Sequence, residues 1–289
     1  MSNARRYDTV SLITDLGSGT DELGVLHALM RDLAADVRVI DVANDIAPFD
    51  VRAASLALAR LVPYLPEGIV IACVDPGAGS ERRLVAVEVG DGAGIFLGPD
   101  NGLLATGVAL AGGAGRSIVL DRDEHHLAAP GRTFAARDVL VPVAAALANG
   151  HDLETLGSPI DPASLLPSVI PIARLENGAL ACEVIWVDRF GNCQINASAD
   201  DLHQIDGAEA PVGRLRVTIG SDVRNLRVVE SFDALGSAAL GLVVDASGLL
   251  SLAIDRASAA RELGVAEGDQ VVLSAAGEET PTSVPVRMR

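Results

Sequence analysis

The fold of the N-terminal half is decided by the stretch YDTVSLITDLGSGTDELGVLHALMRDLAADVRVIDV, residues 7–42. It begins with a β-prone run, 7–13, and ends with another, 37–42. Between them, residues recur at helical spacing at Leu23, Leu26, His27, Met30 and Leu33. A strand, a helix and a strand in this order form a βαβ unit, which is usually parallel and right-handed.

A second unit of the same kind follows the first. Asp50 stands in the N-cap position before the Ala- and Leu-rich stretch 51–61, which predicts a helix. Pro63 and Pro66 end that helix, and the apolar run 69–74 predicts the next strand. The N-terminal half therefore alternates strands and helices.

Further along, the β-prone runs 84–89 and 95–97 are separated by the Gly-rich segment 90–94, which predicts a hairpin. An Ala-rich helix is expected over about 139–149. Together these elements predict an α/β domain whose mixed, largely parallel sheet is covered by helices.

Prolines mark a domain boundary within residues 157–171. Beyond it, short apolar runs bounded by Gly, Asp and Asn are typical of a small all-β sandwich or barrel; these runs are 180–187, 215–219, 240–244, 249–254 and 270–273. We therefore expect an α/β domain at 1–160, a Pro-rich linker at 161–175 and a β-barrel domain at 176–289.

Composition narrows the class of protein. The 289 residues include 22 Lys and Arg against 39 Asp and Glu, a net charge of −17 that disfavours nucleic acid and anionic membranes as partners. Every apolar run is shorter than the ~20 residues of a membrane span, and the N-terminus lacks a signal-peptide pattern, so we expect a cytoplasmic protein. The three cysteines form no CxxC pair, which argues against disulfides and zinc and for buried thiols.

Polar loops follow the predicted strands, where ligands bind in open α/β sheets. Asp15 ends the first strand, and its carboxylate suits either a sugar diol or a helix or turn cap. Phe49 lies in the loop 44–50, where its ring is either core or a stacking wall. Each loop is a candidate ligand contact with a structural alternative.

The loop 75–83, DPGAGSERR, follows the apolar strand directly. Asp75 and Arg82, seven residues apart across a glycine turn, can form a charge-assisted pair that fixes the carboxylate's orientation. A structural salt bridge is the alternative, because surface ion pairs are common. A strongly oriented carboxylate at a strand end is nevertheless a candidate catalytic group.

In the C-terminal domain, the loop 188–192, DRFGN, follows a predicted strand. Phe190 and the amide of Asn192 offer a stacking ring with a donor and an acceptor, a plausible purine pocket. A simple Gly-Asn turn is the alternative. The segment 98–102, GPDNG, is typical of a turn.

Taken in order, six segments resemble the S-adenosylmethionine hydroxide adenosyltransferase family, hydrolases related to fluorinases and chlorinases; they are TDLG, NDIAPFDV, CVDPGAGSERR, GPDNGLL, TFAARD and DRFGN. The resemblance covers nearly the whole chain. It implies an N-terminal α/β domain, a C-terminal β-barrel and a homotrimer whose active sites lie between one subunit's N-domain and its neighbour's C-domain.

The resemblance also implies roles for individual residues. Asp15 would hold the ribose hydroxyls, and Phe49 stands where the halogenases have a Trp. For the remaining substrate contacts, adenine would meet Phe190 and Asn192, the methionine ammonium Asp188, and the substrate carboxylate Ser247. Asp75 stands where the halogenases carry a Tyr, and Asp75 with Arg82 is the hydrolase pattern, which implies water as the nucleophile.

The chain departs from the family at Ala135, where the family's third polar residue is a His. Expulsion of a neutral thioether from a sulfonium needs no general acid. Asp75, fixed by Arg82, can orient the water and receive its proton, so loss of the His predicts a slow enzyme and not an inactive one. His125 or His126 would have to fold back to substitute for the missing imidazole, but both lie in the charged segment 121–126, which is typical of a solvated loop.

The expected activity is hydrolysis of S-adenosyl-L-methionine to adenosine and L-methionine, with neither metal nor organic cofactor. The alternative is a non-catalytic binder of adenosine or S-adenosylmethionine, suggested by Ala135. A halogenase is disfavoured, because the carboxylate of Asp75 would repel a halide and Ala136 replaces the Ser that contacts halide in those enzymes.

Overall fold

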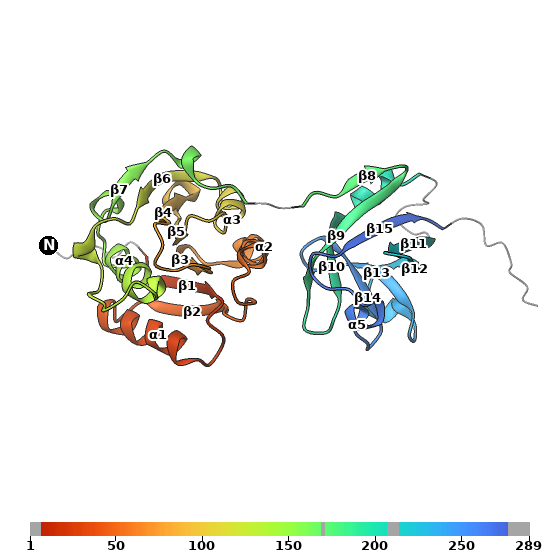
Figure 1. Cartoon of the computed structure of the whole chain (residues 1–289), viewed down its shortest axis with the longest axis horizontal. Helices are drawn as coiled ribbons and strands as arrows, with labels where there is room; N and C mark the ends of the chain where they lie inside the picture. The colour runs from red at the N-terminus through yellow and green to blue at the C-terminus, as the bar shows by residue number, and fades with distance from the viewer. Residues whose placement is uncertain (1–6, 169–170, 207–213, 277–289) are drawn as a thin grey trace, which may run out of the picture. The chain divides into compact units, whose positions relative to one another are not determined.

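The computed structural model describes residues 7–168, 171–206 and 214–276. The chain divides into two compact units, residues 1–170 and 171–289 (Figure 1). Each unit has hydrophobic clusters of its own and is described by itself. The division follows the proline-rich part of the sequence.

The first unit contains a seven-stranded sheet in the order β2-β1-β3-β5-β4-β6-β7. Its strands are β1 (Thr9–Thr14), β2 (Arg38–Ala43), β3 (Gly68–Cys73), β4 (Leu84–Val89), β5 (Gly94–Pro99), β6 (Ala114–Val119) and β7 (Ser158–Ile160). Strands β2, β1, β3 and β5 run parallel, and the remaining pairings are antiparallel. The predicted mixed sheet is confirmed, and β4 with β5 forms the predicted hairpin.

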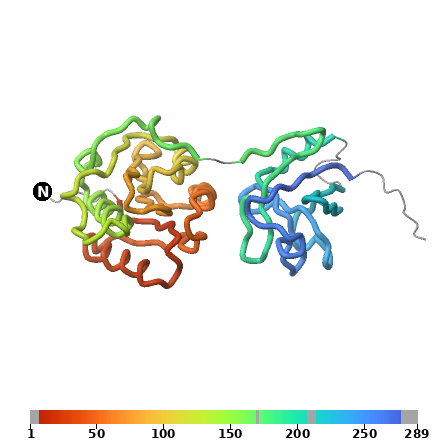
Figure 2. Tube along the Cα trace, in the orientation of Figure 1, coloured from red at the N-terminus to blue at the C-terminus, as the bar shows by residue number. Residues whose placement is uncertain are grey.

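Helices cover both faces of this sheet, because its central strands are buried on both sides. In β3, Ile69 and Ile71 point into one hydrophobic cluster, and Val70 and Ala72 point into the other. The first cluster includes residues of α1 (Asp21–Leu33) and α4 (Val141–Ala148), and the second includes residues of α2 (Val51–Leu61) and α3 (Ala105–Leu110). Figure 2 traces α1 and α4 side by side.

The helix starts follow from local chemistry. The Thr20 side chain accepts a hydrogen bond from the Leu23 amide, and Asp50 accepts one from the Ala53 amide at 2.8 Å. Both caps satisfy amide groups that have no partner in the first turn. The Asp50 cap read from the sequence is confirmed.

The second unit is a β-barrel. Its strands are β8 (Arg174–Glu176), β9 (Ala179–Val187), β10 (Cys193–Ser198), β11 (Arg214–Ile219), β12 (Asp222–Val229), β13 (Leu240–Val244), β14 (Leu249–Ile254) and β15 (Gln270–Ala275), with the short helix α5 (Ala259–Leu263). Strand β9 pairs with both β15 and β10, which closes the ring, and β8 adds to β9. The sequence pattern alone is typical of either a sandwich or a barrel, and the closed ring of strands shows that the second unit is a barrel.

Two barrel strands escaped the sequence reading for the same physical reason. Strand β12 carries Asp222, Arg224 and Arg227, and only Leu226 is buried along it. Strand β10 alternates polar side chains with apolar ones, and the polar Gln194 is itself buried. One face of each strand is therefore polar, and no continuous apolar run marks it.

The prolines act at the edges of the two units. Pro159 lies in the edge strand β7, where a missing amide costs no ladder bond on the open side. Residues 162–164 form a 3-10 turn, and the Leu166 amide donates to the buried Asp100 of the first unit. The stretch after β7 is thus held against the first unit.

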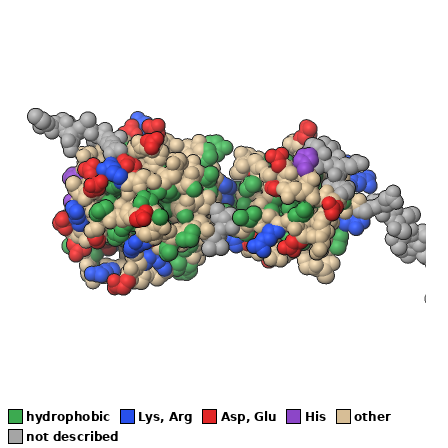
Figure 3. Space-filling view, turned by 90° about the horizontal axis from the view of Figure 1, so that it is seen from above, with side chains coloured by type: hydrophobic (Ala, Val, Ile, Leu, Met, Phe, Trp, Pro, Cys, Tyr) green, Lys and Arg blue, Asp and Glu red, His purple; other side chains and the backbone are tan. Residues whose placement is uncertain are grey.

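Three further features bear on the class of protein: the distribution of surface charge, the length of the helices and the state of the cysteines. Acidic and basic side chains are interspersed over the face drawn in Figure 3. Among the described residues, no helix is long and apolar enough to cross a membrane. The three cysteines are free and buried, as predicted.

Candidate functional site

The carboxyl ends of two neighbouring strands bring Asp15 and Asp75 to one edge of the sheet. Strand β1 pairs with β3 in parallel register, with Thr14 opposite Cys73. Burial, together with the smaller effects of the Asp75 and Asp15 carboxylates, raises the pKa of the Cys73 thiol to about 12. Both carboxylates therefore act on the same buried sulfur, as expected for side chains that share a strand edge.

The Asp75 carboxylate is nearly enclosed and held in one orientation. Only 9% of its side chain is exposed, and Arg82 donates from Nη1 to Asp75 Oδ1. The same nitrogen donates to the Pro76 carbonyl at 3.0 Å, which anchors the guanidinium to the turn. The ion pair predicted from the spacing is present, and its burial distinguishes it from a solvated surface pair.

The turn between these residues depends on glycine. Gly79 has a φ of +88°, and a Cβ there would lie 2.8 Å from the Arg132 carbonyl oxygen. Only glycine allows this backbone to approach so closely at positive φ. Gly79 thus brings the loop that holds Asp75 against the segment that contains Arg132.

The GPDNG segment, read from the sequence only as a turn, is a scaffold for Asp75. Asn101 donates from Nδ2 to the Val74 carbonyl at 2.9 Å and accepts from the Leu103 amide at 3.1 Å. Asp100 is only 6% exposed and accepts a hydrogen bond from Arg83. The Asn101 bond fixes the backbone immediately before Asp75. An Asp and an Asn side by side after a buried strand are a sequence signal for such support, because buried polar side chains need hydrogen-bond partners.

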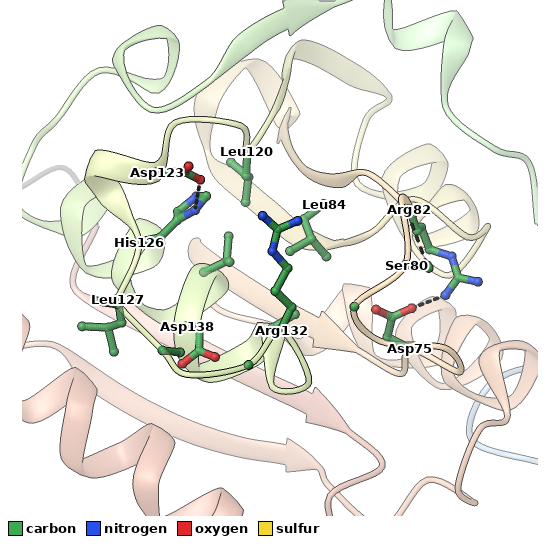
Figure 4. Close-up of a pocket in the computed structure, with 16 residues that line it drawn as sticks. Asp75, Ser80, Arg82, Leu84, Leu120, Asp123, His126, Leu127, Arg132 and Asp138 are labelled. Atoms are coloured by element: carbon green, nitrogen blue, oxygen red, sulfur yellow. Dashed lines mark hydrogen bonds and ion pairs between the residues drawn. The ribbon is translucent and has the colours of Figure 1, made fainter.

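A cavity of about 500 Å³ opens beside this pair. Asp75 and Arg82 lie on one side of it, Asp123 and His126 lie on the other, and Arg132 lies between them (Figure 4). Its remaining lining residues include Gly79, Ser80, Leu84, Leu120, Leu127, Ala135, Asp138 and Val139. The cavity is therefore a mixed polar and apolar space next to a fixed carboxylate.

Ala135 lines the cavity, and Ala136 is buried. Residues 136–140 form a π-helical turn, a distortion that occurs often at functional sites. Within this turn, both oxygens of Asp138 accept from Arg137, at 2.6 and 3.0 Å. The methyl groups at 135 and 136 offer the cavity no proton-transfer group.

His126 departs from the expectation of a solvated loop. Its neighbours Asp123 and Glu124 are exposed, but only 14% of the His126 side chain is exposed. Its Nδ1 lies 3.6 Å from Asp123 Oδ1, and within the described part of the chain its buried Nε2 has no hydrogen-bond partner. Burial lowers the pKa of His126, and the Asp123 charge opposes that shift. The charged residues of segment 121–126 did not predict the burial of His126, because its imidazole packs inward while the acidic side chains point into solvent.

Phe49 is not part of the core. Its side chain is 71% exposed, and its backbone has a φ of +70°, which is rare for a bulky residue. The Phe49 amide donates to Asp15 Oδ2 at 2.9 Å. The structure therefore joins two predicted site residues, because one Asp15 oxygen holds the strained loop that presents the ring.

In the second unit, Asp188 organises its own loop. Its Oδ1 accepts from the amides of Phe190 and Asn192, at 2.9 and 2.8 Å, and its Oδ2 accepts from Asn192 Nδ2 at 2.8 Å. The Phe190 side chain is 77% exposed. The loop is thus a rigid turn that presents an aromatic ring.

Ser247 lies exposed in the loop after β13. Its amide donates to Asp245 Oδ1 at 2.8 Å, and Asp245 Oδ2 accepts from Ser251 Oγ at 3.1 Å. The Ser247 hydroxyl is therefore carried on an ordered turn. Among the described residues, no group of three or more His, Cys, Asp or Glu side chains is arranged to hold a metal ion.

Comparison with known proteins gives a consistent result for both units. The family model for the SAM hydroxide adenosyltransferase N-terminal domain matches residues 10–157, and the model for the C-terminal domain matches residues 182–272. A protein of Salinispora tropica named (R)-S-adenosyl-L-methionine hydrolase is 36% identical, over 92% of this chain and 97% of its own. One of the same name from Thermus thermophilus is 35% identical, over 91% and 98%.

More distant relatives include a fluorinase of Actinopolyspora mzabensis, 28% identical over 94% of this chain and 98% of its own. A solved structure of an uncharacterised conserved protein from Thermotoga maritima is 28% identical, with a TM-score of 0.82 over 92% of this chain and 99% of that one. The proteins named hydrolases are thus more similar in sequence than the fluorinase.

Proposed function

The chain belongs to the SAM hydroxide adenosyltransferase family, and we propose that it hydrolyses S-adenosyl-L-methionine to adenosine and L-methionine. The observation that carries this conclusion is the buried, oriented Asp75–Arg82 pair beside a cavity at the strand edge. The relatives named (R)-S-adenosyl-L-methionine hydrolase support it.

In the proposed reaction, water attacks C5′ of the ribose from the side opposite sulfur. The O–C5′ bond forms as the C5′–S bond breaks, and the electron pair of that bond passes to sulfur to give a neutral thioether. Asp75 orients the water and receives its proton, and Arg82 holds the carboxylate. General-base help of this kind is typically worth ~10²- to 10⁴-fold. The leaving group needs no acid, because it departs without negative charge.

We propose that the remaining sequence-predicted residues hold the substrate. One oxygen of Asp15 accepts from the Phe49 amide, which leaves the other for the ribose hydroxyls. Phe49 and Phe190 carry exposed rings suited to the methionyl side and adenine. Asn192, Asp188 and Ser247 would address adenine, the ammonium and the carboxylate of the substrate.

We also propose a homotrimer, in which the exposed Phe49 and Phe190 rings become covered when subunits assemble around substrate. Light scattering of the pure protein, with and without S-adenosylmethionine, tests this state. A monomer at micromolar concentration that still turns over would contradict it. A cytoplasmic location stays a prediction from the sequence, which cell fractionation tests.

The deciding experiment incubates the pure protein with S-adenosyl-L-methionine in H₂¹⁸O. Adenosine with ¹⁸O at its 5′ position, together with unlabelled methionine, is the expected result by mass spectrometry. No adenosine above a buffer control rejects the activity. Adenosine without the label would show that its 5′ oxygen did not come from water, and would contradict water as the nucleophile.

Ala135 gives specific support to a second candidate, a non-catalytic binder of S-adenosylmethionine or adenosine. This candidate predicts that the protein retains intact ligand in calorimetry without turnover, and that Ala135→His creates activity. For a halogenase, the carboxylate of Asp75 is unfavourable because it repels halide. Chloride-dependent formation of 5′-chloro-5′-deoxyadenosine would reverse that judgement.

A further inference from the structure

The wall of the cavity that faces Asp75 carries an imidazole with an unused nitrogen. His126 lines the same cavity as Asp75, Arg82 and Ala135. Among the described residues its buried Nε2 has no hydrogen-bond partner, although a buried polar atom normally has one. Such an orphan atom beside a reactive carboxylate needs an explanation, and packing alone does not give one.

We propose that His126 is the final proton acceptor of this cavity, and that it performs the task that Ala135 cannot. The inference rests on the proposed hydrolysis. The proton that leaves the attacking water passes from Asp75 through water in the cavity to Nε2 of His126. The imidazolium then returns the proton to solvent, so Asp75 is ionised again for the next turnover.

The position of His126 requires water between it and Asp75. Figure 4 shows the two side chains on opposite sides of the cavity, with Arg132 between them. At about 30 Å³ per water molecule, a cavity of about 500 Å³ has room for a chain of waters. Arg132 makes no ion pair within the described part of the chain, so its guanidinium is available to donate to that water.

The charges around His126 suit a proton acceptor. Burial lowers its pKa, so the imidazole is neutral at pH 7 and the Nε2 lone pair is available. On the same segment, Asp123 faces Nδ1 of His126. The charges of Asp123 and Glu124 raise the pKa of His126, and the charge of His125 lowers it. Across the cavity it faces the neutralised Asp75–Arg82 pair, Arg132, and Asp138, which is paired with Arg137. With Nδ1–H directed to Asp123, Nε2 is the accepting nitrogen.

The test compares His126→Gln with His125→Gln, since Gln keeps a polar side chain without a titrating ring. His125 is a matched control, because its Nε2 lies 3.1 Å from the Thr155 carbonyl. For His126→Gln we expect kcat to fall by about 10²-fold, the lower end of general-base contributions, with KM within about two-fold. His125→Gln should stay within about two-fold of the wild type in both constants.

Two further readouts separate proton transfer from a structural role. The wild-type kcat should decrease as pH falls below 6.5, because protonated Nε2 accepts nothing, and His126→Gln should lack that limb. Adding Ala135→His to His126→Gln should restore at least ten-fold of the lost kcat, because an imidazole returns to the same cavity. Should His126→Gln misfold, the wild-type pH profile still decides.

A wild-type kcat that is flat from pH 8 to 5, or a folded His126→Gln with wild-type kcat, overturns the role of His126 and leaves the hydrolase intact. If the wild-type protein forms no adenosine, the proposed hydrolysis is wrong, and the role of His126 is rejected together with it. The two failures are thus distinguished by the wild-type assay alone.

Discussion

The loops that begin at Asp75 and Asp188 share a plan but use their aspartates differently. Both follow a strand and both turn at a glycine with positive φ. Asp75 gives an oxygen to a guanidinium and lies against a cavity, whereas Asp188 gives both oxygens to its own loop. In the proposed hydrolysis the Asp75 carboxylate receives a proton, whereas the Asp188 carboxylate fixes the loop that carries an exposed ring.

Asp15 stands between these two cases. Like Asp188, it accepts from the amide of an exposed phenylalanine, here Phe49, and like Asp75 it follows a parallel strand of the first unit. Under the proposed function, an aspartate that follows a strand is therefore a reactive group at 75, a structural acceptor at 188, and both a substrate contact and a structural acceptor at 15. Which one applies depends on the donors around it. These are a nearby guanidinium for Asp75, two amides and one side chain of its own loop for Asp188, and a backbone amide distant in sequence for Asp15.

The largest expected effect tests the reactive carboxylate. Asp75→Asn should lower kcat for adenosine formation by ~10²- to 10⁴-fold, because an amide neither orients water equally nor accepts its proton. Steady-state assays with quantified adenosine measure it. Glu81→Gln, which changes an exposed carboxylate on the same loop, is the control and should retain more than about a third of wild-type kcat. Equal losses in both variants would remove the distinction between the two loops.

The next effect tests the brace. Asp188→Ala removes the acceptor of two amide bonds and one side-chain bond, at a net ~0.5–1.5 kcal/mol each, so unfolding of the second unit should become easier by about 1.5–4.5 kcal/mol. Because Phe190 and Asn192 lose their fixed positions, KM should rise more than kcat falls. Asp188→Asn keeps one acceptor oxygen and should recover part of both. A fall in kcat with unchanged KM would instead place Asp188 in the chemistry.

A third test asks whether the Asp75 loop is as rigid as the Asp188 loop. Gly77 and Gly79 both have positive φ, +89° and +88°, but only at Gly79 would a Cβ meet a backbone oxygen. Gly77→Ala should cost the ~1–2 kcal/mol of a left-handed alanine, and Gly79→Ala should cost about 1–3 kcal/mol more through steric overlap. Chemical denaturation measures both. Equal costs would mean that the approach to Arg132 is loose and that the loop yields.

Much of the fold was predictable because strands such as β3 are continuous apolar runs. Residues 69–74 are such a run, and β3 occupies 68–73. The barrel strands β10 and β12 were not predictable, since polar side chains interrupt the apolar residues of each.

The site divides along the same line. The spacing of Asp75 and Arg82 predicted their pair, because both residues lie on one short loop. The support from Asn101 and the inward turn of His126 were out of reach, because each depends on a partner set by tertiary packing. Local signals thus predicted the charges, and long-range contacts decided their surroundings.

The smallest expected effect separates strain from contact at Phe49. Its φ of +70° costs a bulky residue ~1–2 kcal/mol. Glycine avoids this strain but loses ~0.5–1 kcal/mol of chain entropy, so Phe49→Gly should be as stable as the wild type or up to ~1.5 kcal/mol more stable. Phe49→Ala keeps the strain and should gain nothing. Both lose the ring and should raise KM alike, since the 71% exposed side chain contributes little to packing. If Phe49→Gly proved less stable than Phe49→Ala, the hydrogen bond from the Phe49 amide to Asp15 would not be holding a strained loop. Asp15 would then lack the structural role of Asp188 and would be more similar to Asp75.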